Sequence, residues 1–324
     1  MCTAVSFLSN CHYFGRNLDL EYCYQEAVTI TPRNFPFHFR NKESIVSHFA
    51  LIGIATVANH YPLYYDATNE AGLSMAGLNF PGNAFYGTKQ IDMYNITPFE
   101  LIPWILCQCK TVQDAQIMLS KTHIIGIPFS PEYPLTDLHW IIADRERSIT
   151  VEPMKNGLVI MENPVGVLTN NPPFDYHLHN LKNYLSLSEK DPENHFAPDL
   201  SLKPYSRGMG AMGLPGDLSS ASRFIKAAFT KIHSVTPKEE NQSVSQFFHI
   251  LGSAAQQEGC VKVGNGFEKT VYSSCCNTDK GIYYYTTYEN SQITAVHMHT
   301  ENLSGDQLIS YPLLHTAQIR AENP

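Results

Sequence analysis

The chain has 324 residues, 43% of them hydrophobic and 16% charged, a balance typical of a globular protein with a substantial core. Its net charge of −8 argues against nucleic-acid binding, which requires a basic surface. The longest apolar stretch near the N-terminus, Phe49 to Ala58, is about half a membrane span, and no secretory signal precedes Cys2. We therefore expect a cytoplasmic protein that does not insert into a membrane.

The first predicted strand, residues 3–8, begins directly after Cys2, which follows the initiator Met1. Once Met1 is removed, Cys2 carries both a thiol nucleophile and a free α-amine. The ordinary pKa of an α-amine, about 7.7–8.0, suits it to act as the general base for that thiol. Position alone favours the alternative, an ordinary free cysteine.

A second strand is predicted at residues 12–17, after a short turn at Ser9-Asn10. The resulting hairpin places Arg16 and Asp19 alongside Cys2. A guanidinium there would stabilise the thiolate, and a carboxylate would orient the α-ammonium. Taken alone, Arg16 and Asp19 equally fit a surface ion pair.

The rest of the chain alternates between predicted strands and helices, without repeats or low-complexity segments. Strands are predicted at 27–32, 49–57, 72–78, 139–143, 148–152, 157–161, 166–168, 270–276, 281–287 and 292–299. Helices are predicted from Thr97 to about Cys109, and at 111–120, 174–186, 219–233 and 243–257. Sheets flanked by pairs of helices indicate a layered α+β architecture.

Several blocks together resemble the choloylglycine hydrolases, N-terminal nucleophile amidohydrolases that include bile salt hydrolases and penicillin V acylases. Besides Met1-Cys2, the blocks are F-G-R-N-L-D at 14–19, N-E-A-G-L-S-M-A-G-L-N-F-P-G at 69–82, L-T-N-N-P-P-F-D-Y-H at 168–177 and G-L-P-G-D-L-S-S-A-S-R-F at 213–224. The resemblance covers nearly the whole chain. It implies a single domain over residues 1–324 with a four-layer αββα sandwich, and hydrolysis of conjugated bile acids without a cofactor or metal.

The resemblance also implies roles for individual residues. Cys2 matches the family's nucleophile, Asn79 and Asn170 match the positions of the oxyanion hole, and Arg223 matches an active-site arginine. With Arg16 and Asp19 these residues form the expected catalytic group. Without the resemblance, Asn79 and Asn170 fit ordinary turn chemistry, and Arg223 fits a solvated helical position.

Aromatic and apolar side chains are dense in three segments that match the family's pocket loops. We expect them to hold the steroid body of the substrate; Tyr side chains packed into the core are the alternative. The expected substrate-binding residues are Tyr22, Tyr24, His60, Tyr61, Leu63, Tyr65, Ile127 and Phe129. Arg207 is also expected to bind substrate, because Ser206-Arg207-Gly208 resembles a family motif associated with glycine conjugates; a solvated loop residue is the alternative. Asn79, in place of the Tyr usual in penicillin V acylases, favours a bile salt hydrolase.

Two alternatives remain open at this stage. A penicillin V acylase or another N-acyl amidohydrolase would differ only in the acyl group. A non-catalytic binding or metal protein would use His297-Met-His299, which is a weak signal without further ligands.

The eight cysteines are too sparse for a disulfide framework, so we expect free thiols. Residues 185–213 match the insertion through which family members form tetramers, which predicts a homotetramer.

Overall fold

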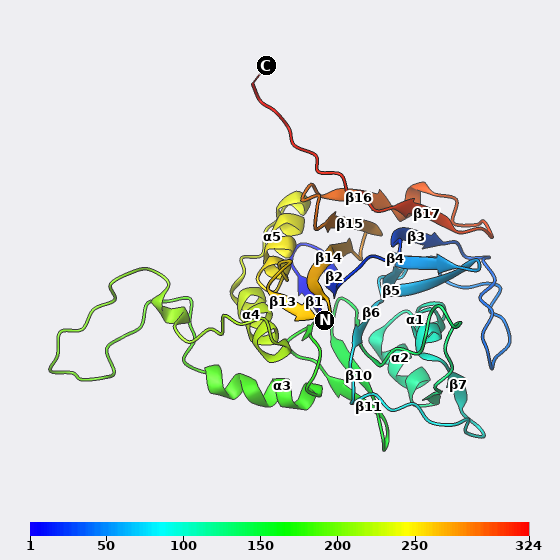
Figure 1. The fold of residues 1–324 in the computed structure, drawn as a ribbon, viewed down its shortest axis with the longest axis horizontal. Coiled ribbons are helices and arrows are strands. Elements are labelled where there is room, and N and C mark those ends of the chain that lie inside the picture. The colour runs from blue at the N-terminus through cyan, green and yellow to red at the C-terminus, as the bar shows by residue number, and fades with distance from the viewer. Residues whose placement is uncertain (324) are drawn as a thin grey trace.

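A computed structural model describes residues 1–323, and two antiparallel sheets form its centre (Figure 1). The first sheet has the strand order β12-β1-β2-β14-β15-β16, with β13 paired to β14. Its strands are β1 (Cys2–Leu8), β2 (His12–Leu20), β12 (Val167–Leu168), β13 (Val261–Val263), β14 (Gly266–Asn277), β15 (Ile282–Thr287) and β16 (Thr294–His297). The predicted hairpin is confirmed, because β1 and β2 pair from Cys2↔Leu18 to Leu8↔His12.

The second sheet has the order β11-β10-β9-β6-β5-β4-β3-β17. Its strands are β3 (Ala27–Thr31), β4 (Leu51–Ala58), β5 (Tyr61–Asn69), β6 (Ser74–Asn79), β9 (Leu138–Ala143), β10 (Ser148–Met154), β11 (Gly157–Glu162) and β17 (Ile309–Pro312). A small parallel pair, β7 (Tyr94–Ile96) and β8 (Thr122–Ile124), lies apart from both sheets. Five of these strands, β5, β7, β8, β13 and β17, were not predicted from the sequence.

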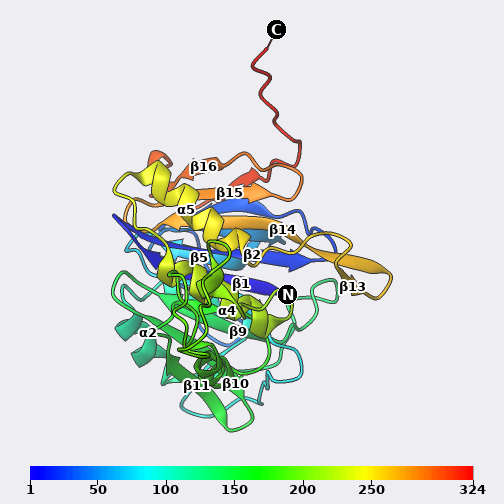
Figure 2. The same cartoon turned by 90° about the vertical axis from the view of Figure 1, so that its left-hand side faces the viewer.

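Helices cover the outer faces of the two sheets. On the first sheet, α4 (Ser220–His233) packs against β1 and α5 (Glu240–Gly252) against β14, as Figure 2 shows face-on. On the second, α1 (Leu101–Leu106) packs against β5 and β6, followed along the chain by α2 (Val112–Leu119). The layers run helix, sheet, sheet, helix across Figure 1, so the expected αββα sandwich is confirmed.

Some helix boundaries differ from the prediction. The helix expected from Thr97 to Cys109 is a 3₁₀ turn, Pro98–Glu100, followed by α1, which ends at Leu106. The helix expected at 174–186 is α3 (Phe174–Asn180), which tightens into a 3₁₀ turn at Leu181–Tyr184. Tightening of this kind is common at helix ends. Two further 3₁₀ turns lie at Met209–Ala211 and Met298–Thr300.

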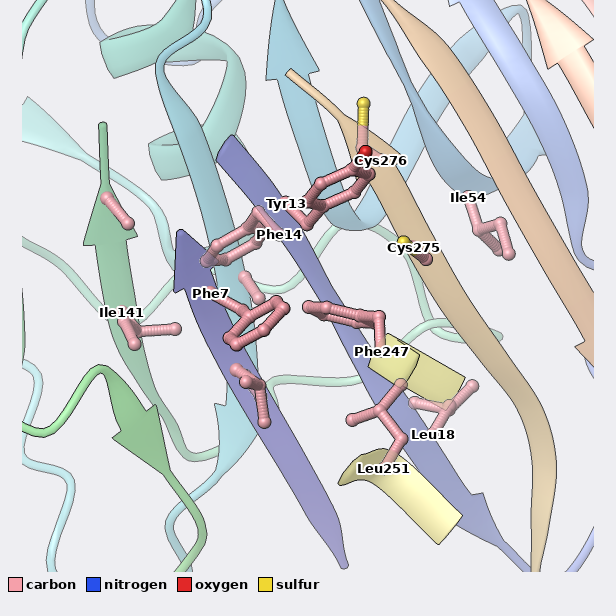
Figure 3. Close-up of a cluster of buried hydrophobic side chains, with 14 of the residues drawn as sticks. Phe7, Tyr13, Phe14, Leu18, Ile54, Ile141, Phe247, Leu251, Cys275 and Cys276 are labelled. Carbon is pink, nitrogen blue, oxygen red and sulfur yellow. The ribbon is translucent and has the colours of Figure 1, made fainter. Parts of the chain in front are cut away.

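Two apolar clusters hold the layers together. One joins both sheets to α4 and α5 and includes Phe7, Leu18, Ile141 and Phe247 (Figure 3). The other fills the space between the second sheet and α1 and α2, with Trp104 and Trp140 among its largest members. Because both sheets are covered on both faces, central strands such as β2 and β6 are buried along nearly their whole length.

Residues 185–213 form an excursion that projects away from the layered body, at the left of Figure 1. Within it the only regular element is the 3₁₀ turn Met209–Ala211. No helix among residues 1–323 has both the length and the apolar character that a bilayer span requires. All eight cysteines are free.

Candidate active site

Cys2 is the first residue of β1 and is 3% exposed. On one side of β1 it pairs with Leu18 of β2. On the other side β12 pairs antiparallel, with Ala4 opposite Leu168, and this register brings Asn170 across from Cys2. The backbone nitrogen of Cys2 donates a hydrogen bond of 2.8 Å to Oδ1 of Asn170. Residues 168 positions apart thus meet at the nitrogen that becomes the α-amine of a chain lacking Met1.

Asn170 connects three parts of the site. Its Oδ1 also accepts a hydrogen bond of 2.7 Å from Nη2 of Arg223. Its Nδ2 donates to the backbone carbonyl of Asn79, at 2.7 Å. Asn79 ends β6, so this bond ties the second sheet to the residues around Cys2. Among the predicted residues, Cys2, Asn79, Asn170 and Arg223 are therefore brought together.

Arg223 lies in the first turn of α4, and its side chain is fully buried. The helix begins at Ser219, whose hydroxyl accepts a hydrogen bond from the backbone of Ser222. The guanidinium donates to the carbonyl of Cys2 and, at 2.7 Å, to the hydroxyl of Thr3. Burial lowers the pKa of Arg223, and the nearby carboxylate of Asp19 opposes that shift. The alternative interpretation of Arg223 as a solvated helical residue is therefore wrong.

Asp19 follows the residue that pairs with Cys2 and is also fully buried. Its Oδ1 accepts a hydrogen bond of 2.7 Å from Thr270, and its Oδ2 is 3.8 Å from Nη1 of Arg223. Within residues 1–323, Oδ2 has no hydrogen-bond partner. Burial raises the pKa of Asp19, while Arg223 and the N-terminal ammonium oppose that shift. One carboxylate oxygen thus remains free to accept a hydrogen bond at this buried position.

Arg16 extends from the first sheet to the second. Its Nη1 donates to the backbone carbonyls of Gly77 and, at 3.1 Å, Tyr65. Burial acts to lower the pKa of Arg16, but the Cys2 thiol, Tyr272 and Asp66 raise it above its ordinary value. Arg16 and Asp19 are both fully buried, so the alternative of a surface ion pair is excluded.

Two residues of β14 beside the N-terminus were not anticipated. Glu268 is 3% exposed and forms an ion pair with the α-ammonium of Met1. Thr270 binds Asp19, as described above. The same ammonium donates to the carbonyl of Asp19, at 2.7 Å. Glu268 and Thr270 are separated from Cys2 by more than 260 positions in an ordinary strand sequence, so no local signal marks them.

Buried polar groups fix the segment that carries Asn170. The backbone nitrogen of Asn170 donates to Oγ of Ser220, at 2.8 Å, and its carbonyl lies 3.0 Å from Nε2 of His177. His139 lies between the carbonyl of Thr169, at 2.8 Å from Nε2, and Glu152, at 3.0 Å from Nδ1. These contacts restrict the movement of Asn170 relative to Cys2.

His177 gives a prediction for the pH dependence of stability. Burial lowers the pKa of His177 from 6.5 to about 4, so the folded chain holds the ring neutral where the unfolded chain binds a proton. The contribution of the neutral His177 ring to the free energy of unfolding is complete above pH 6.5 and is lost as the pH falls towards 4. Between pH 7.5 and about 4.5, we expect the melting temperature of His177→Gln to fall less than that of the parent. Circular dichroism measures both.

The matched control is His179→Gln, two residues further along α3, where the side chain is exposed. It should show the same acid destabilisation as the parent. Part of the loss should persist in His177→Gln, because burial also lowers the pKa of His12 to about 4. Identical pH profiles for the parent and His177→Gln would contradict the assignment.

The predicted pocket segments lie at the same end of the sheets as Cys2. Asn79 pairs with Leu138, so the loop before β9, which includes Ile127 and Phe129, reaches this end. The pairing of β5 with β6 places the start of β5 beside the end of β6. The turn between β4 and β5, at Asn59-His60, therefore also lies at this end. The segment after β2 carries Tyr22 and Tyr24, whose hydroxyls are 2.8 Å apart.

Individual side chains in these segments differ in their surroundings. His60 is exposed in the turn, and Tyr22 is also exposed. Tyr61, Leu63 and Tyr65, expected in a loop, instead lie on β5. Tyr61 is buried against Phe129, with ring centroids 5.7 Å apart, so for this residue the structure matches the core alternative. Leu63, Tyr65, Ile127 and Phe129 are half-buried.

The structure does not bring Arg207 to this group. Arg207 is exposed within the excursion, which projects away from the N-terminus in Figure 1. Its position within one chain therefore does not support the interpretation of Arg207 as a residue beside the leaving group. In the described part of the chain, His297 and His299 belong to no cluster of three or more metal-ligating side chains.

The chain is similar to known proteins along nearly its whole length. Residues 2–311 match the model of the linear amide C–N hydrolases, choloylglycine hydrolase family. A "Bile salt hydrolase/transferase" from Lactiplantibacillus plantarum is 54% identical, and one from Clostridium perfringens is 38% identical, each over 100% of both chains.

Solved structures show the same fold. The C2A mutant of a conjugated bile acid hydrolase from Clostridium perfringens superimposes with a TM-score of 0.92 at 37% identity, covering 100% of both chains. Penicillin V acylase from Agrobacterium tumefaciens gives a TM-score of 0.77 at 17% identity, covering 95% of this chain and 90% of that one. At that identity the second likeness concerns the fold alone.

Proposed function

The chain belongs to the choloylglycine hydrolase family of linear amide C–N hydrolases, and from this premise we propose how Cys2 cleaves the amide bond of conjugated bile acids. The hydrolase activity follows from the full-length relatives. The residue roles rest on the geometry around Cys2. The observation that carries them is the hydrogen bond from the Cys2 nitrogen to Asn170, which is itself bound to Arg223.

The reaction begins when the thiol of Cys2 attacks the amide carbon. The α-amine of Cys2 takes the thiol proton and then delivers it to the leaving amine, while the acyl group stays on sulfur as a thioester. Water, deprotonated by the same α-amine, hydrolyses the thioester and releases the bile acid. Asn170 orients the amine through Oδ1, because a nitrogen that donates there directs its lone pair elsewhere.

Charge around Cys2 supports this sequence of steps. Arg223 and Arg16 are buried cations that favour the thiolate and the developing oxyanion. Asp19 offers an unoccupied carboxylate oxygen for the α-ammonium that forms during attack. One N–H of the Asn170 side-chain amide donates to the carbonyl of Asn79, and the other is available to the oxyanion. Asn79 is the second residue that we assign to the oxyanion hole.

A direct assay distinguishes the proposed substrate from the runner-up. We expect the purified chain without Met1 to release cholate from glycocholate with kcat/KM at least about tenfold above that for phenoxymethylpenicillin, measured by chromatography of products. The physical reason is that aromatic side chains at the catalytic end offer surface for a large steroid body. A preference for phenoxymethylpenicillin would favour the penicillin V acylase function instead.

The predicted homotetramer is proposed on the basis of the excursion at 185–213. Its apolar side chains are unusually exposed for a monomer: Leu185 is 84%, Phe196 86% and Tyr205 83% exposed. We expect light scattering after size exclusion to give four times the chain mass, and Leu185→Ser with Phe196→Ser to give a smaller species. A monomeric parent would contradict the proposal.

A cytoplasmic location is proposed from the free cysteines.

A further inference from the structure

Two buried charges link the two sheets beside the catalytic group. Arg16, on the first sheet, donates to the carbonyls of Tyr65 and Gly77 on the second. Asp66, on the second sheet and 1% exposed, accepts hydrogen bonds from residues of the first. Arg16 therefore extends from the first sheet to the second, and Asp66 from the second sheet to the first.

Three hydroxyl groups hold the Asp66 carboxylate. Tyr272 donates to Oδ1 at 3.0 Å, Tyr283 donates to Oδ2, and Ser274 donates to Oδ2 at 3.4 Å. Ser274 in turn accepts from the backbone nitrogen of Arg16, at 3.1 Å. Burial raises the pKa of Asp66, and Arg16 and the two phenols oppose that shift. The catalytic steps do not use Asp66, although three side chains donate hydrogen bonds to its carboxylate.

Arg16 connects this group to the nucleophile. Arg16 pairs with Ala4 in β1, two residues from Cys2, so their side chains lie diagonally on one face of the sheet. We propose that Asp66 is a positioning residue whose negative charge balances Arg16 and thereby sets how strongly Arg16 stabilises the Cys2 thiolate. The inference rests on the proposed function, since it concerns the same nucleophile.

The direction of the effect follows from charge alone. Removing the Asp66 charge leaves the Arg16 guanidinium less compensated, and this favours the thiolate and disfavours the α-ammonium. Both changes move the acid limb of the activity to lower pH. The charged and titratable groups that face this region from the neighbouring elements are Arg16, Asp19, Arg223, Glu268, Tyr272, Tyr283, Cys276 and the α-amine. All of these groups are still present in Asp66→Asn, so the substitution removes one charge and no other titratable group.

The test compares Asp66→Asn with the parent, both shown by intact mass to lack Met1. The rate of Cys2 alkylation by iodoacetamide and kcat/KM for glycocholate are each measured from pH 4 to 8. We expect both midpoints to fall by about 0.5–1 pH unit in Asp66→Asn. The matched control is Thr68→Val, one repeat further along the same face of β5 and equally buried. It should lose stability without moving either midpoint.

Alkylation keeps this inference separate from the proposed function, because it reports on Cys2 whether or not bile acids are hydrolysed. Unchanged midpoints in folded Asp66→Asn, or an equal shift in Thr68→Val, would overturn the inference. If Asp66→Asn does not fold, Tyr272→Phe with Tyr283→Phe replaces it. Loss of both donors raises the pKa of Asp66 further, which weakens its negative charge near Arg16, and a downward shift of the same sign should follow. An unshifted midpoint in that variant would also overturn the inference.

Discussion

Cys2→Ala should abolish hydrolysis of glycocholate, with kcat reduced at least about 10⁴-fold. The substitution removes the only atom that forms the thioester, and removal of a nucleophile from a comparable catalytic group costs about 10⁶-fold. Asn79, Asn170 and Arg223 remain in place but have no covalent intermediate to stabilise. Product formation over several hours, followed by chromatography, measures the residual rate.

The fold should survive this substitution, because a small buried thiol is replaced by a methyl group. Calorimetric titration should show that Cys2→Ala still binds glycocholate, with an affinity within a few-fold of the KM of the parent. Cys2→Ser is the second comparison: it keeps a nucleophilic atom in the same position, so its loss should be smaller than that of Cys2→Ala. Residual activity of Cys2→Ala within tenfold of the parent would contradict the role of Cys2.

A chain that retains Met1 should be equally inactive, although no side chain has changed. With Met1 attached, the nitrogen of Cys2 belongs to a peptide bond and has no useful basicity, so the thiol lacks its base. Such a chain can be prepared by inhibiting methionine aminopeptidase during expression and identified by intact mass. We expect no turnover of glycocholate above the rate of the Cys2→Ala variant.

The retained Met1 should not unfold the protein. Its ammonium pairs with the buried Glu268 and donates to the carbonyl of Asp19, so the unprocessed N-terminus is well accommodated. Melting temperatures of the two forms should therefore lie within a few degrees of each other. A large loss of stability on retention of Met1 would attribute the inactivity to misfolding instead.

The parts of the site closest in sequence were predictable. Arg16 and Asp19 follow Cys2 within one hairpin, and the alternating pattern with a tight turn is sufficient to place them beside it. Asn170 and Arg223 were identified only through the family resemblance. Their contacts with Cys2 depend on the β1–β12 register and on the start of α4, and neither follows from periodicity.

Other features could not be predicted, for physical reasons. In β5, Pro62 and a run of tyrosines resemble a loop, whereas burial on both faces of the second sheet selects the same residues for a strand. Tyr61 shows the consequence, since an aromatic residue of a pocket and one of a core look alike in sequence. Glu268 was missed because its significance lies wholly in a contact across the fold.

Progressive removal of Met1 tests the central claim, that the Cys2 α-amine and thiol act together, most directly. Met1-bearing protein is treated with methionine aminopeptidase, and samples are taken for intact mass and for glycocholate turnover. Activity should rise in direct proportion to the fraction of chains that begin with Cys2, along a line through the origin. Full turnover before Met1 is lost, or none after its complete removal from folded protein, would contradict the account.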